Sequence, residues 1–205
     1  MNPLVVDNFI SPPSIDSIYA MFKSDEMKWS FHKESLDYYD PEGDNLYYTE
    51  EPTQNHPQFR HGFVKDNQVT SDLYKYLSPL LEMYENCGLG KPDYISRIKA
   101  NLLVPYQGPK LSPPHTDTSF FNYGTHSIQH SFERKTLLYY VNDSDGDTVF
   151  YNERWNGERI GKLTVQQRVK PVKGRAIIFD SNQIHSASAP TDKKYRIVLN
   201  CVFGK

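Results

Sequence analysis

Apolar residues near the start of the chain recur at helical spacing. Ile15, Ile18 and Phe22 lie three and four positions apart and would form one stripe along a helix. The preceding Ser11 to Ser14 run, Ser-Pro-Pro-Ser, is typical of a helix start, because serine can cap free amides and proline is tolerated in the first turn. The pattern predicts a first helix directly after Ser11.

A second helical pattern begins at Ser71, after a polar stretch from Lys23 to Asn67 that shows no periodicity. Its apolar residues would share one face: Leu73, Leu77, Leu80, Leu81 and Tyr84. Pro79 should kink or split this helix, and Gly88 favours its end. We therefore expect a second, interrupted helix.

From Tyr94 onward the pattern changes to short strands separated by turn residues. The expected strands are Ile95 to Val104, Thr136 to Val141, Thr148 to Tyr151, Gln167 to Val172, Arg175 to Phe179 and Arg196 to Phe203. Helices followed by strands predict a mainly β, α+β fold in which the helices support one sheet. We expect a single domain, with residues 1–93 as a helical and irregular support region and residues 94–205 as the β core.

Charge and composition narrow the function classes. The 205 residues carry 23 basic and 25 acidic side chains, so the chain lacks the basic excess of a general nucleic-acid binder. It has two cysteines, and Cys201 lies in an apolar run, which argues against a disulfide scaffold and favours a reducing compartment. Neither a signal peptide nor a membrane-spanning run is visible, so we expect a soluble, cytoplasmic protein.

His115 and Asp117 are the first candidate metal ligands. In an extended segment, side chains two apart point to the same face, so these two could bind one ion. Such a triplet is common by chance. Taken alone, it is better explained by a turn in which Asp117 forms hydrogen bonds with the local backbone.

His185 changes this balance. It follows the apolar run from Arg175 to Phe179, which predicts a buried strand that ends in a turn at residues 180–182. Two imidazoles and one carboxylate on one face of a metal leave the opposite positions open, as in non-haem iron(II) oxygenases. A structural zinc site would be closed and would favour cysteine, and neither cysteine lies near this group in the sequence.

Arg196 opens the last apolar strand. Burying a permanent cation without an anionic partner is costly, so Arg196 should bind a carboxylate ligand or form an internal ion pair. An exposed strand end is the alternative. With the three candidate metal ligands also present, capture of a dicarboxylate is the favoured interpretation.

These residues resemble the iron(II)/2-oxoglutarate-dependent dioxygenases, and within them the prolyl-4-hydroxylase-like branch. The resemblance covers most of the chain, in segments that follow the family's order: Val5 to Ser11, Tyr106 to Asp117, Leu137 to Asn142 with Gly146 to Phe150, Lys173 to Phe179, and His185-Ser186 with Tyr195-Arg196. There are two departures. Asp147 stands where the family often has a second glycine, and the segment between His185 and Arg196 is slightly long. The extra length falls in an evident loop, so we expect an intact site.

The resemblance implies a double-stranded β-helix, that is, a jelly-roll or cupin-like barrel, with supporting N-terminal helices. It implies that the three candidate ligands bind iron(II) at the open end and that Arg196 grips the far carboxylate of 2-oxoglutarate. It further implies phenolic hydrogen bonds to this cosubstrate from Tyr140 and Tyr106, for which core packing is the alternative. The implied reaction is hydroxylation of a substrate C–H bond by O2, with release of succinate and CO2, and ascorbate is a further candidate cofactor.

Aromatic residues beside the expected iron site are candidates for substrate contact: Phe120, Tyr123 and Trp155. Packing under a loop explains Phe120 equally well. The leading function is hydroxylation of a small-molecule or peptide substrate, with a prolyl or other amino-acid residue as the first candidate. The alternatives are a cupin-like protein that binds a metal or small molecule without turnover, and a nucleic-acid demethylase of the same superfamily, which the charge balance disfavours.

Overall fold

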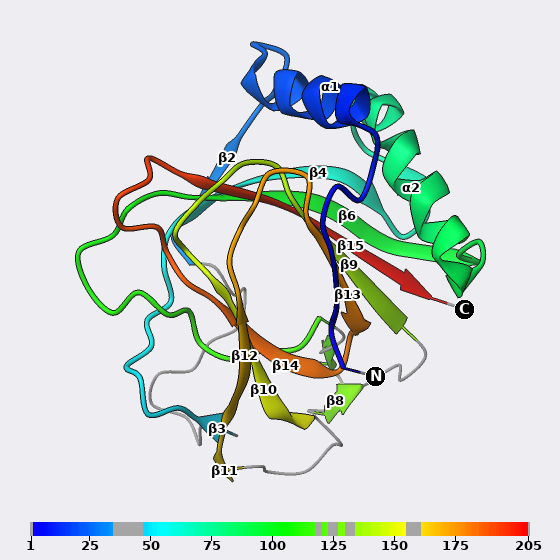
Figure 1. The fold of residues 1–205 in the computed structure, drawn as a ribbon. Helices are drawn as coiled ribbons and strands as arrows, with labels where there is room; N and C mark the ends of the chain where they lie inside the picture. Colours follow the sequence, from blue (N-terminus) through cyan, green and yellow to red (C-terminus); the bar gives the residue numbers. More distant parts are fainter. Residues whose placement is uncertain are drawn as a thin grey trace.

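Two β-sheets that face each other and a layer of helices make up the fold (Figure 1). The computed structural model describes residues 2–34, 47–117, 120–122, 127–129, 134–154 and 161–204. Within these residues, no helix is long and apolar enough to cross a membrane.

The larger sheet has eight strands in the described part of the chain, in the order β1-β13-β9-β15-β6-β4-β2, with β5 paired to β4. Neighbouring strands run antiparallel. The strands are β1 (Leu4–Val6), β2 (Ser30–His32), β4 (Gln58–Lys65), β5 (Gln68–Val69), β6 (Tyr94–Leu103), β9 (Arg134–Tyr140), β13 (Ala176–Asp180) and β15 (Arg196–Gly204).

The smaller sheet consists of β12 (Val165–Val169), β10 (Thr148–Arg154) and β14 (Gln183–Ala187), also antiparallel. Two short pairs lie outside both sheets, β3 (Tyr47–Tyr48) with β11 (Gly161–Lys162) and β7 (Phe120–Asn122) with β8 (Ser127–Gln129). Side chains from both sheets form one buried apolar cluster: Leu138, Tyr140, Phe150, Val169, Ile177, Phe179 and Val198. This arrangement is the expected double-stranded β-helix, with a core that fills the space between its two sheets.

The helices cover the outer face of the larger sheet (Figure 1). Helix α1 (Pro12–Lys23) begins after Ser11, as predicted, and buries the apolar stripe that includes Ile15 and Ile18. The second pattern forms three consecutive short helices of different types. They are the 3-10 helix η1 (Asp72–Leu77), the α-helix α2 (Ser78–Tyr84) and the π-helix η2 (Glu85–Leu89). Pro79 stands in the first turn of α2 and Gly88 has a positive φ of 81°. The predicted interruption and end are therefore confirmed.

Some strands differ from the sequence expectation. The N-terminal region, expected to be helical and irregular, also supplies β1, β2, β4 and β5 to the larger sheet. His185 lies inside a strand, β14, where only a turn was expected before it. The Gln183–Ala187 segment has little apolar alternation, and it is extended because it pairs with β10.

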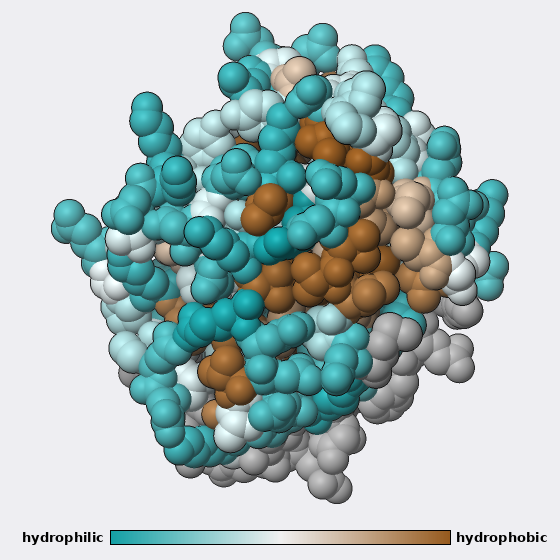
Figure 2. Space-filling view, viewed as in Figure 1, coloured by the Kyte–Doolittle hydropathy of each residue, from teal (hydrophilic) through white to brown (hydrophobic). Residues whose placement is uncertain are grey.

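Apolar side chains gather near the middle of the face seen in Figure 2, where the N-terminal segment crosses the molecule in Figure 1. Leu4 and Val5 of β1 are 47% and 38% exposed. The strand β1 is an edge strand of the larger sheet, so one of its two hydrogen-bonding edges has no further strand paired with it among the described residues.

Candidate metal centre and cosubstrate pocket

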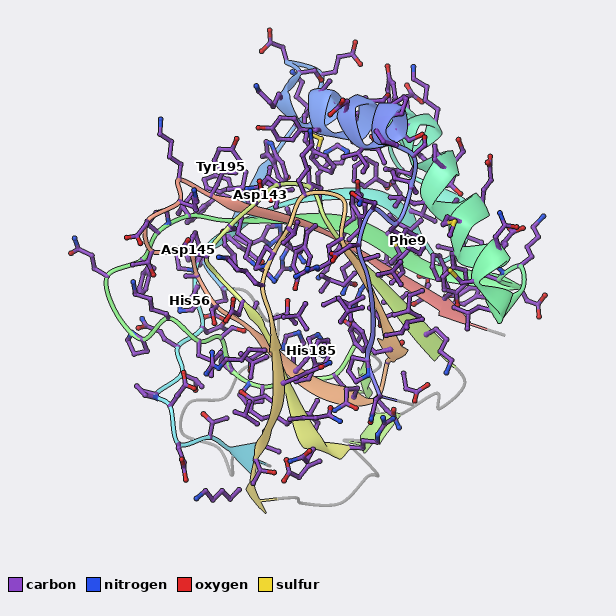
Figure 3. All side chains as sticks on the ribbon, viewed as in Figure 1. Phe9, His56, Asp143, Asp145, His185 and Tyr195 are labelled. Atoms are coloured by element: carbon purple, nitrogen blue, oxygen red, sulfur yellow. The ribbon has the colours of Figure 1, made fainter. Side chains whose placement is uncertain are left out.

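A pair of backbone hydrogen bonds brings His115 and His185 together. The amide of each residue donates to the carbonyl of the other, at 2.9 Å in both directions, which forms an isolated antiparallel bridge beside β14. The ring centroids are 4.4 Å apart. Figure 3 shows His185 in the space between the two sheets. The two imidazoles therefore reach one point from adjacent segments.

Asp117 completes the group. Its amide donates to the carbonyl of Ser181 at 2.9 Å, which fixes the backbone where the chain leaves the bridge. Its Oδ2 lies 3.8 Å from Nε2 of His185. One ligand atom from each of His115, Asp117 and His185 lies within 4.8 Å of the other two. The fold thus brings together the three residues that the sequence singled out as metal ligands.

The hydrogen bonds of the two imidazoles leave one nitrogen of each available. Nδ1 of His115 lies 3.2 Å from the carbonyl of Pro113, and Nδ1 of His185 lies 3.0 Å from the carbonyl of Gln183. Because a carbonyl can only accept, each Nδ1 carries the proton and each Nε2 keeps its lone pair for a metal. Burial and the neighbouring His185, with a small contribution from Lys99, lower the pKa of His115 to about 3, so this ring is neutral at pH 7.

Three side chains hold the carboxylate of Asp117. Arg97 Nη2 donates to Oδ1 at 2.5 Å, and Thr136 Oγ1 donates to Oδ2 at 2.9 Å. Asn200 Nδ2 reaches both oxygens, at 3.2 and 3.1 Å. Burial alone would raise the pKa of Asp117, but the positive charge of Arg97 and the hydrogen bond from Asn200 oppose this effect and lower that pKa. The carboxylate is therefore ionised, as a metal ligand must be.

Sequence reasoning missed these three supporting residues. Thr136 and Asn200 are 0% and 5% exposed and adjoin the apolar runs of β9 and β15. A polar side chain at an inward position of an apolar run was the available signal, because burial of such a group requires a hydrogen-bond partner.

The donor set suits iron(II). Two imidazole nitrogens and one carboxylate oxygen converge from one side, and neither of the free cysteines, Cys87 and Cys201, belongs to the group. This combination matches a two-histidine, one-carboxylate site that leaves coordination positions open for other ligands, and it does not match a closed structural zinc site.

Arg196 lies in the interior beside β10. Its side chain is 2% exposed, so the exposed strand end considered above is wrong. Nε donates to the carbonyl of Gly146 and Nη2 to Oγ1 of Thr148, both at 2.7 Å. Among the described residues, no carboxylate forms a salt bridge with it. Burial lowers the pKa of Arg196, while neighbouring Tyr140 and Asp147 oppose this effect. The guanidinium is thus a buried cation with neutral hydrogen-bond partners, which is the environment expected where an anionic ligand binds.

Tyr140 lies next to this arginine. The Arg196 guanidinium is 5.6 Å from the Tyr140 ring centroid, and the Tyr140 hydroxyl is 2.6 Å from Oγ1 of Thr148. Thr148 therefore links the two side chains, a role that sequence reasoning did not identify. Phe150 and Phe179, which pack with Tyr140 in the inner cluster, also contact the ring of His185. A continuous apolar wall thus runs from the metal ligands to Arg196.

The other predicted site residues are less directly placed. Tyr106 accepts a hydrogen bond from Gln54 at 2.7 Å and packs against His56, with ring centroids 5.2 Å apart. Its contact with the cosubstrate stays a prediction. Phe120 lies in β7, but its side chain, like the whole of Tyr123 and Trp155, falls outside the described residues.

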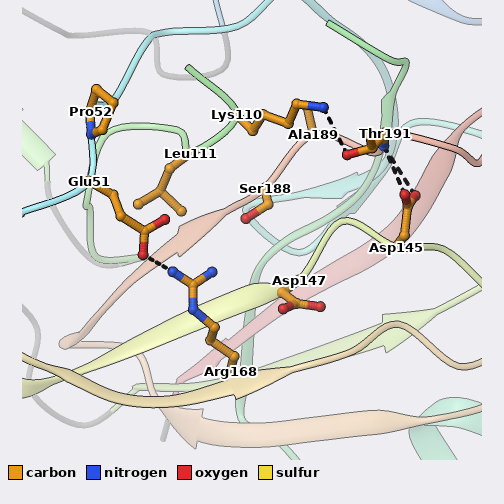
Figure 4. Close-up of a pocket in the computed structure, with 10 residues that line it drawn as sticks. All are labelled: Glu51, Pro52, Lys110, Leu111, Asp145, Asp147, Arg168, Ser188, Ala189 and Thr191. Atoms are coloured by element: carbon orange, nitrogen blue, oxygen red, sulfur yellow. Dashed lines mark hydrogen bonds and ion pairs between the residues drawn. The ribbon is translucent and has the colours of Figure 1, made fainter. Parts of the chain in front are cut away.

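A cavity of about 350 Å³ lies on the opposite side of the smaller sheet (Figure 4). Its position follows from strand register, because lining residue Arg168 pairs with Val149, while the next residue, Phe150, faces His185. Arg168 forms an ion pair with Glu51 across this cavity. The cavity is therefore separate from the metal centre. It is lined by Glu51, Pro52, Lys110, Leu111, Asp145, Asp147, Arg168, Ser188, Ala189 and Thr191.

Comparisons with known proteins point to one family. Residues 103–204 of the chain match the sequence pattern of the 2OG-Fe(II) oxygenase superfamily. No curated protein sequence matches the chain.

Solved structures share the fold at low sequence identity. A prolyl-4-hydroxylase from Pseudomonas putida superposes with a TM-score of 0.56 and 13% identity, over 99% of this chain and 92% of that one. A prolyl hydroxylase from Trichoplax adhaerens was solved with a peptide fragment of the hypoxia inducible factor oxygen degradation domain. It superposes with a TM-score of 0.56 and 14% identity, over 98% of this chain and 83% of that one. HygX from Streptomyces hygroscopicus, solved with nickel, 2-oxoglutarate and hygromycin B, superposes with a TM-score of 0.60 and 10% identity, over 98% of this chain and 82% of that one.

Proposed function

Because the chain belongs to the 2OG-Fe(II) oxygenase superfamily, we propose that it hydroxylates a C–H bond of a small-molecule or peptide substrate and releases succinate and CO2. The observation that carries the proposal is the pairing of two features in one interior. A two-histidine, one-carboxylate group lies at one end of an apolar wall, and the buried cation of Arg196 lies at the other.

In this proposal His115, Asp117 and His185 hold iron(II), which supplies the activation of O2 with 2-oxoglutarate as the reductant. Arg196 binds the far carboxylate of 2-oxoglutarate, since its planar guanidinium can donate two charge-assisted hydrogen bonds to one carboxylate. Tyr140 is close enough to add a phenolic hydrogen bond to the same group. The apolar wall between them excludes water from the reacting centre.

Hydroxylation is preferred to halogenation because the carboxylate ligand is present. Halogenases of this kind lack that carboxylate, so that halide can take its coordination position. Here Asp117 is held by Arg97, Thr136 and Asn200, so it cannot turn away to make room without breaking several hydrogen bonds.

A prolyl or other amino-acid residue is the first substrate candidate. Two prolyl hydroxylases share the fold, and one of them was solved with a peptide bound. Another protein of this fold was solved with hygromycin B, so small molecules remain in the substrate range to be screened. Fold alone is a poor guide to substrate, and the screen has to cover both groups.

The direct test is succinate release with ferrous iron and 2-oxoglutarate, first with proline-containing peptides and then with a panel of amino acids and small molecules. We expect release that depends on substrate, and its loss in His115→Ala and Asp117→Ala. His61→Ala is the matched control, because His61 bonds to Lys28 and Ser71, outside the metal centre.

Two results would overturn the proposal. Full succinate release by Asp117→Ala would remove the assigned metal site. Tight iron binding with no succinate from any substrate would favour the alternative of a cupin-like binding protein without turnover.

A further inference from the structure

Asp147 stands between the two residues that hold Arg196. The guanidinium donates from Nε to the carbonyl of Gly146 and from Nη2 to Oγ1 of Thr148, both at 2.7 Å. Only a few covalent bonds separate the Gly146 carbonyl from the Asp147 carboxylate, so this carboxylate lies within about 10 Å of the guanidinium. The Debye length in 0.1 M salt is also about 10 Å. The two charged groups are therefore close enough to interact without direct contact.

The side chain of Asp147 points away from the interior. Successive side chains of an extended segment point to opposite faces, and Thr148 points inward to Arg196 and Tyr140. Asp147 accordingly lines the cavity on the far side of the smaller sheet (Figure 4). An anion bound to Arg196 from the interior and the Asp147 carboxylate would thus approach the guanidinium from opposite sides.

The carboxylate of Asp147 has no partner of its own. Within the residues that the structure describes, it forms no hydrogen bond and no ion pair. The two cations that line the same cavity are engaged elsewhere. Arg168 forms an ion pair with Glu51, and Lys110 donates to Oγ1 of Thr191 at 2.9 Å. Neither cation therefore neutralises Asp147 by direct contact.

Arg196 needs a counter-charge when no cosubstrate is bound. Its side chain is buried and its hydrogen-bond acceptors, Gly146 and Thr148, are neutral, and a buried cation without a balancing charge is costly. Burial lowers the pKa of Arg196, and the neighbouring Tyr140 and Asp147 oppose that effect. Of these two neighbours, Asp147 is the carboxylate.

We propose that Asp147 is the counter-ion of Arg196 in the cosubstrate-free protein and that it weakens the binding of 2-oxoglutarate. The same charge that stabilises the buried guanidinium repels the far carboxylate of the cosubstrate. Asp147 thus reduces the preference of the pocket for this dicarboxylate over oxo acids with an uncharged tail. The inference rests on the proposed function, because it assumes that Arg196 binds the far carboxylate.

The first test measures ligand affinity by isothermal titration calorimetry in the Co(II)-loaded protein, in which no turnover occurs. It compares 2-oxoglutarate with 2-oxopentanoate, which has a methyl group in place of the far carboxylate. Asp147→Asn should bind 2-oxoglutarate about threefold to tenfold more tightly than the wild type in about 50 mM salt, and about 0.5 M salt should reduce this gain. Its affinity for 2-oxopentanoate should change less than about twofold, because the repelled charge is missing.

Asp93→Asn is the matched control. Asp93 is an exposed carboxylate directly before β6, and the next residue, Tyr94, pairs with Gly204 at the end of β15 opposite to Arg196. This variant removes the same charge and should leave both affinities unchanged. A structural disturbance of the turn before β10 would weaken both ligands alike, so the comparison of the two ligands separates the effect of charge from that of shape.

The second test needs no ligand. A double-mutant cycle combines Asp147→Asn with Arg196→Met, and urea unfolding measures stability in the absence of 2-oxoglutarate. Asp147→Asn should lower the urea midpoint when Arg196 is present. It should leave the midpoint unchanged in Arg196→Met, because no buried cation remains to be balanced. Should Arg196→Met fail to fold, the comparison of the two ligands decides by itself.

Unchanged or weaker 2-oxoglutarate binding in Asp147→Asn would overturn the inference. So would an equal gain in affinity for both oxo acids, or an equal loss of stability with and without Arg196. If the wild type bound no 2-oxoglutarate, the proposed function would fail, whereas the double-mutant cycle would still decide whether Asp147 balances the charge of Arg196.

Discussion

Two amide hydrogen bonds from Asn200 hold both carboxylate oxygens of Asp117, although Asn200 is not itself a candidate ligand. Arg97 and Thr136 each hold one oxygen. A carboxylate held in this way loses little freedom when it binds a metal, so the supporting residues contribute to metal affinity through orientation. Single residues that never touch the metal therefore matter to the site.

Asn200→Ala should weaken Co(II) binding about tenfold, as typically found when a partner of a metal ligand is lost. Isothermal titration calorimetry of the metal-free protein measures this directly. Asn152→Ala is the matched control, because the exposed Asn152 amide bonds to Thr164 away from the centre. Unchanged Co(II) affinity in Asn200→Ala would contradict the orienting role.

Arg196→Met should weaken 2-oxoglutarate binding at least about 100-fold, because a buried carboxylate would lose its charged partner. Iron or cobalt affinity should change little, since the metal ligands do not depend on this side chain. Calorimetric titration of 2-oxoglutarate into the Co(II) protein provides the measurement. Arg175→Met, which removes an ion pair with Asp7 near the surface, is the control. Equal cosubstrate affinity in Arg196→Met would make Arg196 an ordinary strand residue.

At the scale of elements, the turn between β9 and β10 joins the cosubstrate pocket to the long loop before β15. Asp145 accepts hydrogen bonds from the amides of Thr191, Asp192 and Lys193, at distances from 2.7 to 3.3 Å. These hydrogen bonds hold the extra residues of the loop away from Arg196 and the metal ligands. This agrees with the expectation that the longer segment leaves the site intact.

Gly146→Ala should destabilise the protein by about 1–3 kcal/mol through overpacking. An added Cβ would lie 2.4 Å from the Ser188 carbonyl oxygen, and backbone cannot move aside as a flexible side chain can. The variant should also bind 2-oxoglutarate less well, because the Gly146 carbonyl accepts from Arg196. Urea unfolding with and without 2-oxoglutarate separates the two effects.

Gly62→Ala is the control for this substitution. Its added Cβ would meet only Thr70 Oγ1, at an ordinary contact distance of 3.6 Å. We expect a change within about 0.5 kcal/mol. If Gly146→Ala were no more destabilising than Gly62→Ala, the close approach of the two loops would not constrain the fold.

At the scale of the whole molecule, the core between the larger sheet and the helices contains groups that must stay protonated. Burial raises the pKa of the Cys201 thiol from 9.0 to about 12, and it raises the pKa of Tyr84 from 10.0 to about 12. Both groups belong to the same core cluster. Each ionises more readily in the unfolded chain than in the folded one, so alkali favours unfolding.

The free energy of unfolding should be independent of these groups below pH 9 and should fall as pH rises from 9 towards 12. Ionisation of the thiol alone should lower the free energy of unfolding by up to about 1.4 kcal/mol per pH unit in this window. Urea unfolding at pH 7.5, 9 and 10 measures the slope, and Cys201→Ala should reduce it. A slope that is identical in the wild type and Cys201→Ala would show that the thiol does not remain protonated in the folded state.

Elements and candidate ligands whose signals are local could be predicted from the amino-acid sequence. Helix α1 follows from apolar spacing after Ser11, and most of the core strands follow from short apolar runs bounded by turns. The metal ligands and Arg196 were identified from residue type, order and position relative to these runs. Such features can be recognised from the sequence, because each depends on residues only a few positions away.

Contacts between side chains of distant strands could not be predicted in this way, because they arise from how the strands pair in the folded chain. Strand β14 and the support of Asp117 by Arg97 and Asn200 both depend on pairing between segments far apart in the chain. In a sheet, a shift of one residue in register moves every side chain to the other face. The face on which Arg97 lies was therefore set by the pairing of β6 with β15, and no local pattern in the sequence carries that information.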